Sequence, residues 1–216
     1  MEVLKTFLTS FAVGFSGAVT PGPLLLIVIS QTLRMGFLAV PLIITGHSLL
    51  ELATTVGLAM GLKQVLDRPL ISGLIGLGGG AVMLAMGIGM FVEALKEKSS
   101  EPSLLKGKGG EPREIFRPLG LGVVVSLSNP FWTIWWATVG AALVAKALEG
   151  GPHLVPAFYI GHILSDYTWY AAVGLGLVLG FRIIGTKGYR ALLIACSIFL
   201  ALFGIYFIYR GGTDLL

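Results

Sequence analysis

Long apolar runs, separated by short polar or Gly/Pro-rich segments, make up most of the 216-residue chain. A helix of about 20 apolar residues is long enough to cross the hydrocarbon core of a bilayer. The pattern predicts six such spans, at residues 5–33, 36–62, 70–94, 118–145, 153–181 and 188–210. It therefore indicates an all-α integral membrane protein, with no room for a soluble catalytic domain beside the helices.

The composition supports a membrane protein and limits its chemistry. Hydrophobic residues make up 55% of the chain and charged residues only 12%, and the mean hydropathy is +0.88. A soluble domain has roughly 25% charged residues. Cys196 is the single cysteine and lies in an apolar run, so neither an intramolecular disulfide nor a dithiol redox couple can form.

The longest polar segment, residues 96–117, carries six basic residues among acids, serines, glycines and prolines. This composition is typical of a flexible connector. Ten of the 15 Lys and Arg residues fall in this segment and in the two other loops on the same side of the predicted spans. The positive-inside rule therefore predicts a protein of the cell membrane with residues 96–117 in the cytoplasm and both termini outside.

The N-terminal segment also allows a second interpretation, a cleaved signal peptide with Ser16-Gly17-Ala18 as the cleavage site. We disfavour it because apolar sequence resumes at Leu24 and completes a full span, so that cleavage would remove part of that helix.

The two halves of the chain resemble each other in the order of their motifs. A Gly-His pair in each half is followed, four residues after the histidine, by an acid. Because each half holds three spans, the halves must have opposite orientations, and we expect a 3+3 inverted repeat of residues 1–95 and 118–216. The matching positions are Pro21 and Pro130 at an offset of 109 residues, His47 and His162 with Glu51 and Asp166 at an offset of 115, and Gly87 and Gly204 at an offset of 117.

Prolines break the first helix of each half near the middle of the membrane, at Thr20-Pro21-Gly22-Pro23 and at Asn129-Pro130. A proline lacks a backbone N–H and clashes with the carbonyl four residues earlier. The backbone groups freed in this way must be satisfied inside a bilayer. Since broken helix ends offer N–H groups to an anion and carbonyls to a cation, we predict that both breaks bind a zwitterionic solute. Kinks that only shape helix packing are the alternative.

The acids Glu51 and Asp166 each share a helix face with the histidine four residues before them, His47 and His162. A carboxyl group inside a span costs about 3 kcal/mol and normally faces an ion or solute pathway. We therefore predict that these four residues bind the coupling ion or the ammonium group of the solute. The alternative for each histidine is a packed donor bonded to a carbonyl.

Trp132 and Trp136 share one face of the helix that follows the second break. We predict that they line a cation-binding cavity, with anchoring at the membrane interface as the alternative. The many glycines of residues 73–89 are typical of close helix packing, and no Gly-Lys-Ser/Thr signature accompanies them. We therefore expect no nucleotide, no other cofactor and no nucleic acid.

These motifs resemble the lysine-exporter (LysE-type) family of amino-acid efflux transporters. The resemblance covers essentially the whole chain and is carried most strongly by Gly17 to Pro23 with Arg34-x-Gly36, and by Ser126 to Pro130. It implies a secondary transporter that exports amino acids or related small solutes, driven by an ion gradient, by alternating access. Members often carry an acid directly after the glycine of the second helix, where this chain has His47, so the resemblance does not identify the solute.

Two other classes of function are compatible with parts of the sequence. His47, Glu51, His162 and Asp166 would suit a divalent metal-cation exporter if the halves meet. A membrane enzyme is disfavoured, because the chain has no His-Glu-x-x-His, no Gly-x-Ser-x-Gly and no paired cysteines. The expected partners are thus a small solute, a coupling proton or cation and membrane lipid. A homodimer is compatible with an exposed face of small residues.

Overall fold

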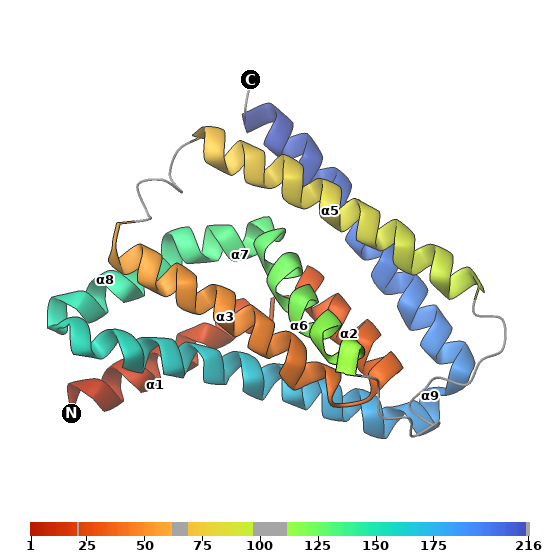
Figure 1. Cartoon of the computed structure of the whole chain (residues 1–216), viewed down its shortest axis with the longest axis horizontal. Coiled ribbons are helices and arrows are strands. Elements are labelled where there is room, and N and C mark those ends of the chain that lie inside the picture. Colours follow the sequence, from red (N-terminus) through yellow and green to blue (C-terminus); the bar gives the residue numbers. More distant parts are fainter. Residues whose placement is uncertain (21, 62–68, 97–111, 215–216) are drawn as a thin grey trace.

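The computed structural model describes residues 1–20, 22–61, 69–96 and 112–214. Within these ranges all regular structure is helical and no strand occurs (Figure 1), which confirms the predicted all-α class. The helices are α1 (Glu2–Ala18), α2 (Pro23–Met35), α3 (Ala39–Ala59), α5 (Pro69–Lys96), α6 (Pro112–Leu127), α7 (Pro130–Trp135), the π-helix η2 (Trp136–Gly140), α8 (Ala141–Gly150), the 3-10 helix η3 (Pro152–Leu154) and α9 (Val155–Asp214).

Four stretches of the described chain are long and apolar enough to cross a membrane: Ala39–Ala59, Pro130–Gly150, Pro152–Gly180 and Ile194–Thr213. The pair α1 and α2, bent by 80° at the first break, is a fifth candidate if it counts as one span. The apolar stretches of α5 and α6 are shorter, at Gly76–Val92 and Phe116–Leu127. The chain is therefore a multi-pass membrane protein with four or five spans recognisable by length and composition.

Two predicted boundaries differ from the structure. The fifth and sixth predicted spans, 153–181 and 188–210, both belong to the single assigned helix α9. The predicted connector 96–117 is shorter at its C-terminal end, because α6 already begins at Pro112; its residues 97–111 lie outside the described part. Pro112 occupies the start of α6, where the missing N–H of proline is tolerated.

The two helix breaks are the starts of new helices. Pro23 and Pro130 occupy the first turn of α2 and α7, where an N–H would have no helical partner and the fixed φ of proline already suits the helix. Gly22 precedes α2 in extended backbone with φ −155°. Asn129 caps α7, its side-chain oxygen accepting a hydrogen bond of 3.1 Å from the backbone N–H of Phe131. Pro21 lies outside the described residues.

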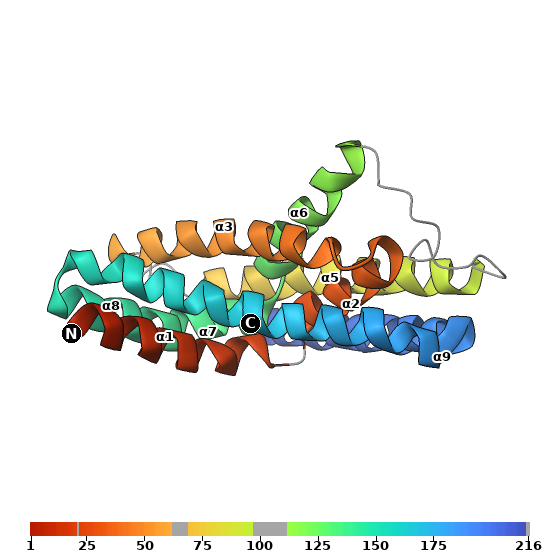
Figure 2. The same ribbon diagram turned by 90° about the horizontal axis from the view of Figure 1, so that it is seen from below.

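Helices from the two halves of the chain pack crosswise. Figures 1 and 2 show α3 beside α6, and the N-terminal part of α9 beside α1. Glycine permits both close contacts: a Cβ added to Gly46 of α3 would collide with the carbonyl of Leu119 in α6, and one added to Gly161 of α9 would collide with the carbonyl of Phe7 in α1. Each half therefore supplies the helix that covers the other half's Gly-His motif.

The C-terminal part of α9 packs against α5, again through glycine (Figure 1). A Cβ on Gly80 or on Gly204 would approach the carbonyl oxygen of the other to 2.7 Å, and one on Gly87 would approach the backbone nitrogen of Ala201 to 2.7 Å. This confirms the predicted packing role for these glycines. Gly78 and Gly89 instead face open space.

Candidate functional site

A cavity of about 260 Å³ lies between the two helix breaks, the middle of α3 and the N-terminal part of α9. The two breaks adjoin each other in its wall, because a Cβ built on Gly22 would lie only 3.6 Å from the side-chain nitrogen of Asn129. An apolar wall of aromatic rings completes the lining, from Phe131, Trp132, Trp135, Trp136 and Tyr170. None of the described residues that line this cavity is a lysine or an arginine.

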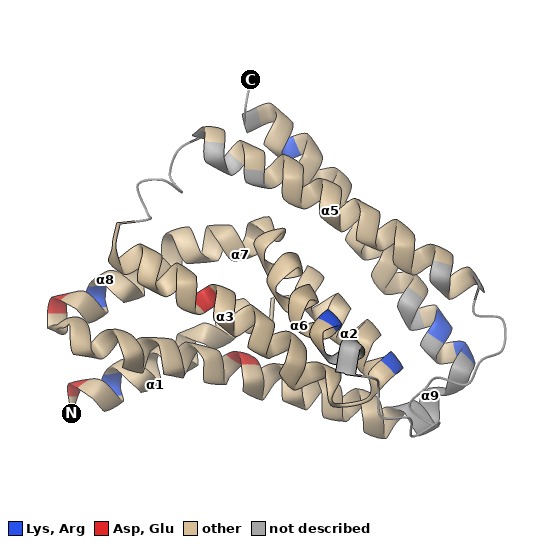
Figure 3. Ribbon diagram, viewed as in Figure 1, with Lys and Arg blue, Asp and Glu red and all other residues tan. Residues whose placement is uncertain are grey.

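The two acids and two histidines expected at the site are all buried there. The exposed fractions are 2% for Glu51, 3% for Asp166, 4% for His47 and 3% for His162, and all four side chains line the cavity. In Figure 3 the acidic residues of α3 and α9 lie in the middle of the bundle, away from its charged ends.

Glycines on the neighbouring helices make room for both histidines. A Cβ on Gly122 of α6 would lie 2.9 Å from the backbone nitrogen of His47, and one on Gly14 of α1 would lie 3.0 Å from Nδ1 of His162. The two Gly-His motifs are therefore seated in equivalent ways, each against the first helix of the opposite half.

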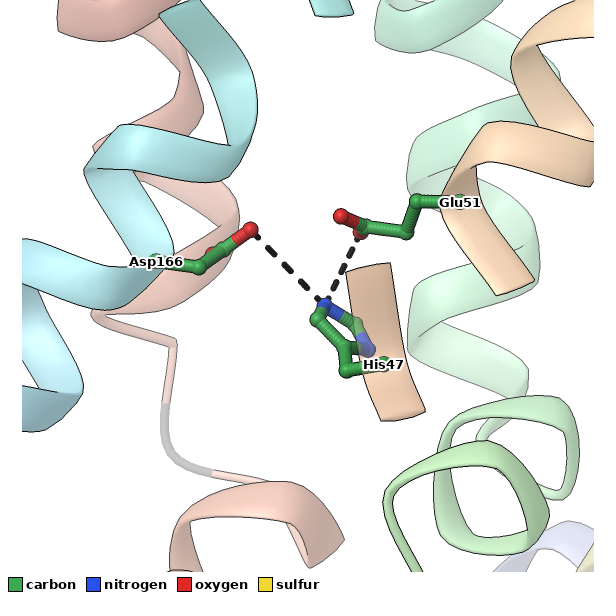
Figure 4. A group of neighbouring side chains, drawn as sticks. All are labelled: His47, Glu51 and Asp166. Atoms are coloured by element: carbon green, nitrogen blue, oxygen red, sulfur yellow. Dashed lines mark ion pairs between the residues drawn. The ribbon is translucent and has the colours of Figure 1, made fainter. Parts of the chain in front are cut away.

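Glu51 is the centre of a hydrogen-bonded cluster. Its Oε1 lies 2.9 Å from Nε2 of His47 (Figure 4) and 3.2 Å from Nε2 of His162. The same oxygen accepts the indole N–H of Trp132 at 3.3 Å and that of Trp136 at 3.2 Å. Because an indole nitrogen can only donate, these contacts favour a carboxylate oxygen without a proton.

Ser126 is the hydrogen-bond partner of His47 on the side away from Glu51. Its hydroxyl lies 2.6 Å from Nδ1 of His47 and 2.7 Å from the carbonyl of Gly122, and its single hydrogen can serve only one of the two. The unprotonated Oε1 of Glu51 requires a donor at Nε2 of His47.

Asp166 is less well satisfied than Glu51. Its Oδ2 lies 3.8 Å from Nε2 of both His47 and His162, beyond hydrogen-bonding distance. Among the described residues, the buried atoms Oδ2 of Asp166, Oε2 of Glu51 and Nδ1 of His162 have no hydrogen-bond partner. Two carboxylate oxygens at this site are thus available to a ligand that donates hydrogen bonds.

Most of the residues predicted to form the binding site line this one cavity. Thr20, Gly22 and Asn129 do so at the breaks, together with Trp132 and Trp136 and the four ionisable residues. Pro23 and Pro130 are buried at the starts of their helices, and Pro21 lies outside the described residues. Whether these residues bind a solute stays a prediction.

Three features of the site did not follow from the sequence. The indole groups of Trp132 and Trp136 bind Glu51, whereas we had expected ring faces toward a cation. Ser126 is a further member of the lining. Trp135 stacks on His162 with ring centroids 4.7 Å apart.

The cluster contains residue types that bind transition metals. One ligand atom from each of His47, Glu51 and Asp166 can be chosen so that all three lie within 4.8 Å of one another. Oε1 of Glu51, however, already accepts two indole N–H groups. We therefore describe these residues as a hydrogen-bonded cluster, and the metal exporter stays a separate hypothesis.

Comparisons with known proteins agree with this picture of a membrane transporter. The family model for the LysE type translocator matches residues 15–211. A Pseudomonas aeruginosa relative named chemotactic transduction protein ChpE is 29% identical over 180 residues, which cover 77% of this chain and 79% of the relative. A Bacillus subtilis protein, YcgF, provisionally named an amino acid efflux protein, is 24% identical over 214 residues, which cover 99% of this chain and 100% of that protein.

No solved structure matches the chain. The family model, however, spans both helix breaks, the cavity lining and both Gly-His motifs. On this match over most of its length, the chain belongs to the LysE type translocator family.

Proposed function

We propose that the protein exports amino acids or related small solutes from the cytoplasm, driven by an ion gradient, by alternating access to a site at the middle of the membrane. The observation that carries this proposal is the cavity of about 260 Å³ that joins both helix breaks to two buried acids. Its volume is below the roughly 300–1,000 Å³ of pockets for drug-sized ligands, which suits a solute the size of an amino acid.

The lining is chemically matched to a zwitterion. The buried carboxyl groups of Glu51 and Asp166 would bind an ammonium group. The start of α2 at Gly22, and the start at Asn129 of the helical stretch that continues through η2 and α8, would offer N–H groups to a carboxylate. The aromatic wall would contact the remainder of the solute.

Alternating access is supported by the crosswise packing of the two halves. Glu51 and Asp166 occupy matching positions in the sequence, and each histidine motif packs against the first helix of the other half. Such an arrangement is expected of six spans in a 3+3 inverted repeat, with the site at the repeat interface. Rocking one half against the other would then open the same cavity to each side in turn.

The proposed orientation rests on the distribution of basic residues. Figure 3 shows the basic residues of α2, of α6 and of the middle of α9 toward one end of the molecule, and the N-terminus and α8 toward the other. By the positive-inside rule, the first of these ends would face the cytoplasm and both termini would lie outside.

A binding measurement on the purified full-length protein in lipid nanodiscs tests the proposal and its main alternative. The common L-amino acids and the ions Zn²⁺, Mn²⁺ and Ni²⁺ would be titrated by calorimetry. Saturable binding of an amino acid, followed by its gradient-driven transport in proteoliposomes, would support amino-acid export. Binding of a metal ion alone, with no amino acid bound, would favour the metal exporter, for which the group of His47, Glu51 and Asp166 is the specific observation.

A further inference from the structure

The two acids that match in sequence differ in their surroundings. Oε1 of Glu51 lies within 3.3 Å of four nitrogen atoms, whereas Oδ2 of Asp166 has no hydrogen-bond partner among the described residues. Both are buried to a similar degree, with exposed fractions of 2% and 3%. The difference therefore lies in polar contacts and not in solvent access.

The sequence explains why the indole contacts exist on one side only. Trp132 and Trp136 follow Pro130 by two and six residues, and the residues at the same distances from Pro21 are Pro23 and Ile27. Neither side chain carries a hydrogen-bond donor. The repeat thus places two N–H donors beside Glu51 and none at the matching positions of the other half.

The two acids lie too close together for both to be ionised easily. One oxygen of each lies within 4.8 Å of the other, and two buried carboxylates at such a distance raise the cost of the second negative charge. Glu51 is the acid whose oxygen accepts two indole N–H groups. The geometry therefore favours the charge on Glu51 and the proton on Asp166.

We propose that Asp166 is the residue at which a proton and the ammonium group of the solute exclude one another, whereas Trp132 and Trp136 hold Glu51 as a permanent carboxylate. In the solute-free protein a proton on the Asp166 carboxyl removes the second negative charge of the acid pair. When the solute binds, its ammonium group supplies the same charge and the proton leaves. This inference rests on the proposed export of amino acids and specifies how the ion gradient is coupled to it.

Mutual exclusion would make the exchange obligatory. After the site has released the solute on one side of the membrane, it reopens to the other side with a proton bound. After it has released the proton there, it reopens to the first side with a solute bound. Inward movement of one proton would thus accompany outward movement of one solute molecule, without a second ion site.

Proton release on binding is the decisive measurement. The amino acid that binds best in the calorimetric screen would be titrated into the wild-type protein in two buffers of different ionisation enthalpy. Where Asp166 is protonated before binding, we expect release of about one proton per solute. Over the pH range in which Asp166 is protonated before binding, the affinity should rise with pH, by up to about tenfold per unit. Binding without proton release, and with an affinity independent of pH, would overturn the inference while leaving the proposed function intact.

Variants assign the proton to one acid. Because a neutral Asn mimics the protonated acid, Asp166→Asn should bind the solute much more weakly, and the binding that remains should release no proton and be independent of pH. Glu51→Gln should lose binding at every pH. Trp132→Phe and Trp136→Phe keep the ring but remove the N–H, so Glu51 should begin to titrate and the pH profile should change. Trp135→Phe is the matched control for the pH profile alone, which it should leave unchanged even if the affinity falls, since its indole donates to Ser16 and not to Glu51. Proton release retained in Asp166→Asn would contradict the assignment.

A spectroscopic measurement covers the case in which Asp166→Asn does not fold. Infrared difference spectra of the wild-type protein should show the C=O band of a protonated carboxyl that disappears when the same amino acid is added. An unchanged band would overturn the inference. If no common amino acid binds at all, the proposed function itself is overturned, and this inference with it.

Discussion

His47 and Ser126, which belong to different halves of the chain, are joined by a hydrogen bond of 2.6 Å between Nδ1 and Oγ. The bond fixes the imidazole so that its Nε2 points at Glu51, 2.9 Å away (Figure 4). A residue next to the second helix break thereby orients the polar cluster of the first half. One hydroxyl group thus connects the segment before the second helix break to the cluster that contains Glu51 and Asp166.

Replacing Ser126 with alanine should therefore weaken solute binding and destabilise the protein. The buried Nδ1 of His47 would lose its hydrogen-bond partner, at a cost of about 1–3 kcal/mol. Thermal melting and calorimetry on the same preparation measure both effects. Ser165→Ala is the matched control, because the buried Ser165 hydroxyl donates only to the carbonyl of His162 in its own helix. An equal loss of binding in both variants would argue against a specific role of Ser126.

Glu51→Gln and Asp166→Asn should both impair gradient-driven efflux from proteoliposomes without unfolding the protein. Each amide preserves the volume of the side chain while removing its charge. Size-exclusion chromatography would verify that the variants remain folded. Wild-type efflux in the double variant would assign the two acids a structural role only.

The double variant Pro21→Ala, Pro23→Ala should bind the solute more weakly while its stability holds or rises. Alanine would allow a continuous helix across the first break, so that the N–H groups now at the start of α2 would be used inside the helix. Asn129→Ala should lower stability by about 0.5–2 kcal/mol, because it removes the cap of α7, and should affect binding less, since Pro130 keeps the break. Unchanged affinity in the double proline variant would mean that the breaks serve packing alone.

Gly46→Ala and Gly161→Ala should each destabilise the protein by about 1–3 kcal/mol or more, since the new methyl group would overlap a carbonyl of the neighbouring helix. Gly176→Ala is a matched control within α9, where the added Cβ meets nothing within 4 Å, and it should be neutral or slightly stabilising. Melting temperatures in one detergent compare the three variants. Equal stability of Gly161→Ala and Gly176→Ala would contradict the close helix contact.

Single cysteines introduced within residues 99–114 should react with a membrane-impermeant thiol reagent only after the membrane has been opened. This follows from the excess of basic residues on that side of the predicted spans. The native Cys196 is buried and provides a low background. Labelling from outside intact cells would reverse the proposed orientation.

The sequence by itself determined the class of the protein, the positions of its helix breaks and most members of the candidate site. A long apolar run indicates a membrane-spanning helix. The helix is the regular structure in which a single segment satisfies its own backbone hydrogen bonds inside a bilayer. Proline marks the breaks through its missing N–H. The spacing of His47 to Glu51, and of His162 to Asp166, follows from helix geometry alone. These signals are local, so each can be read from one segment of the chain.

Only the tertiary structure decided which of these groups contact one another. Trp132 and Trp136 share a helix face in the sequence, but that their N–H groups converge on Glu51 depends on how α7 and η2 lie against α3. The same holds for Ser126 and His47, which are 79 residues apart. The matching motifs of the two halves made Glu51 and Asp166 look equivalent. Their different surroundings arise from contacts between helices. A hydrogen bond between segments far apart in the sequence produces no periodic pattern in either segment, so it cannot be predicted from either one.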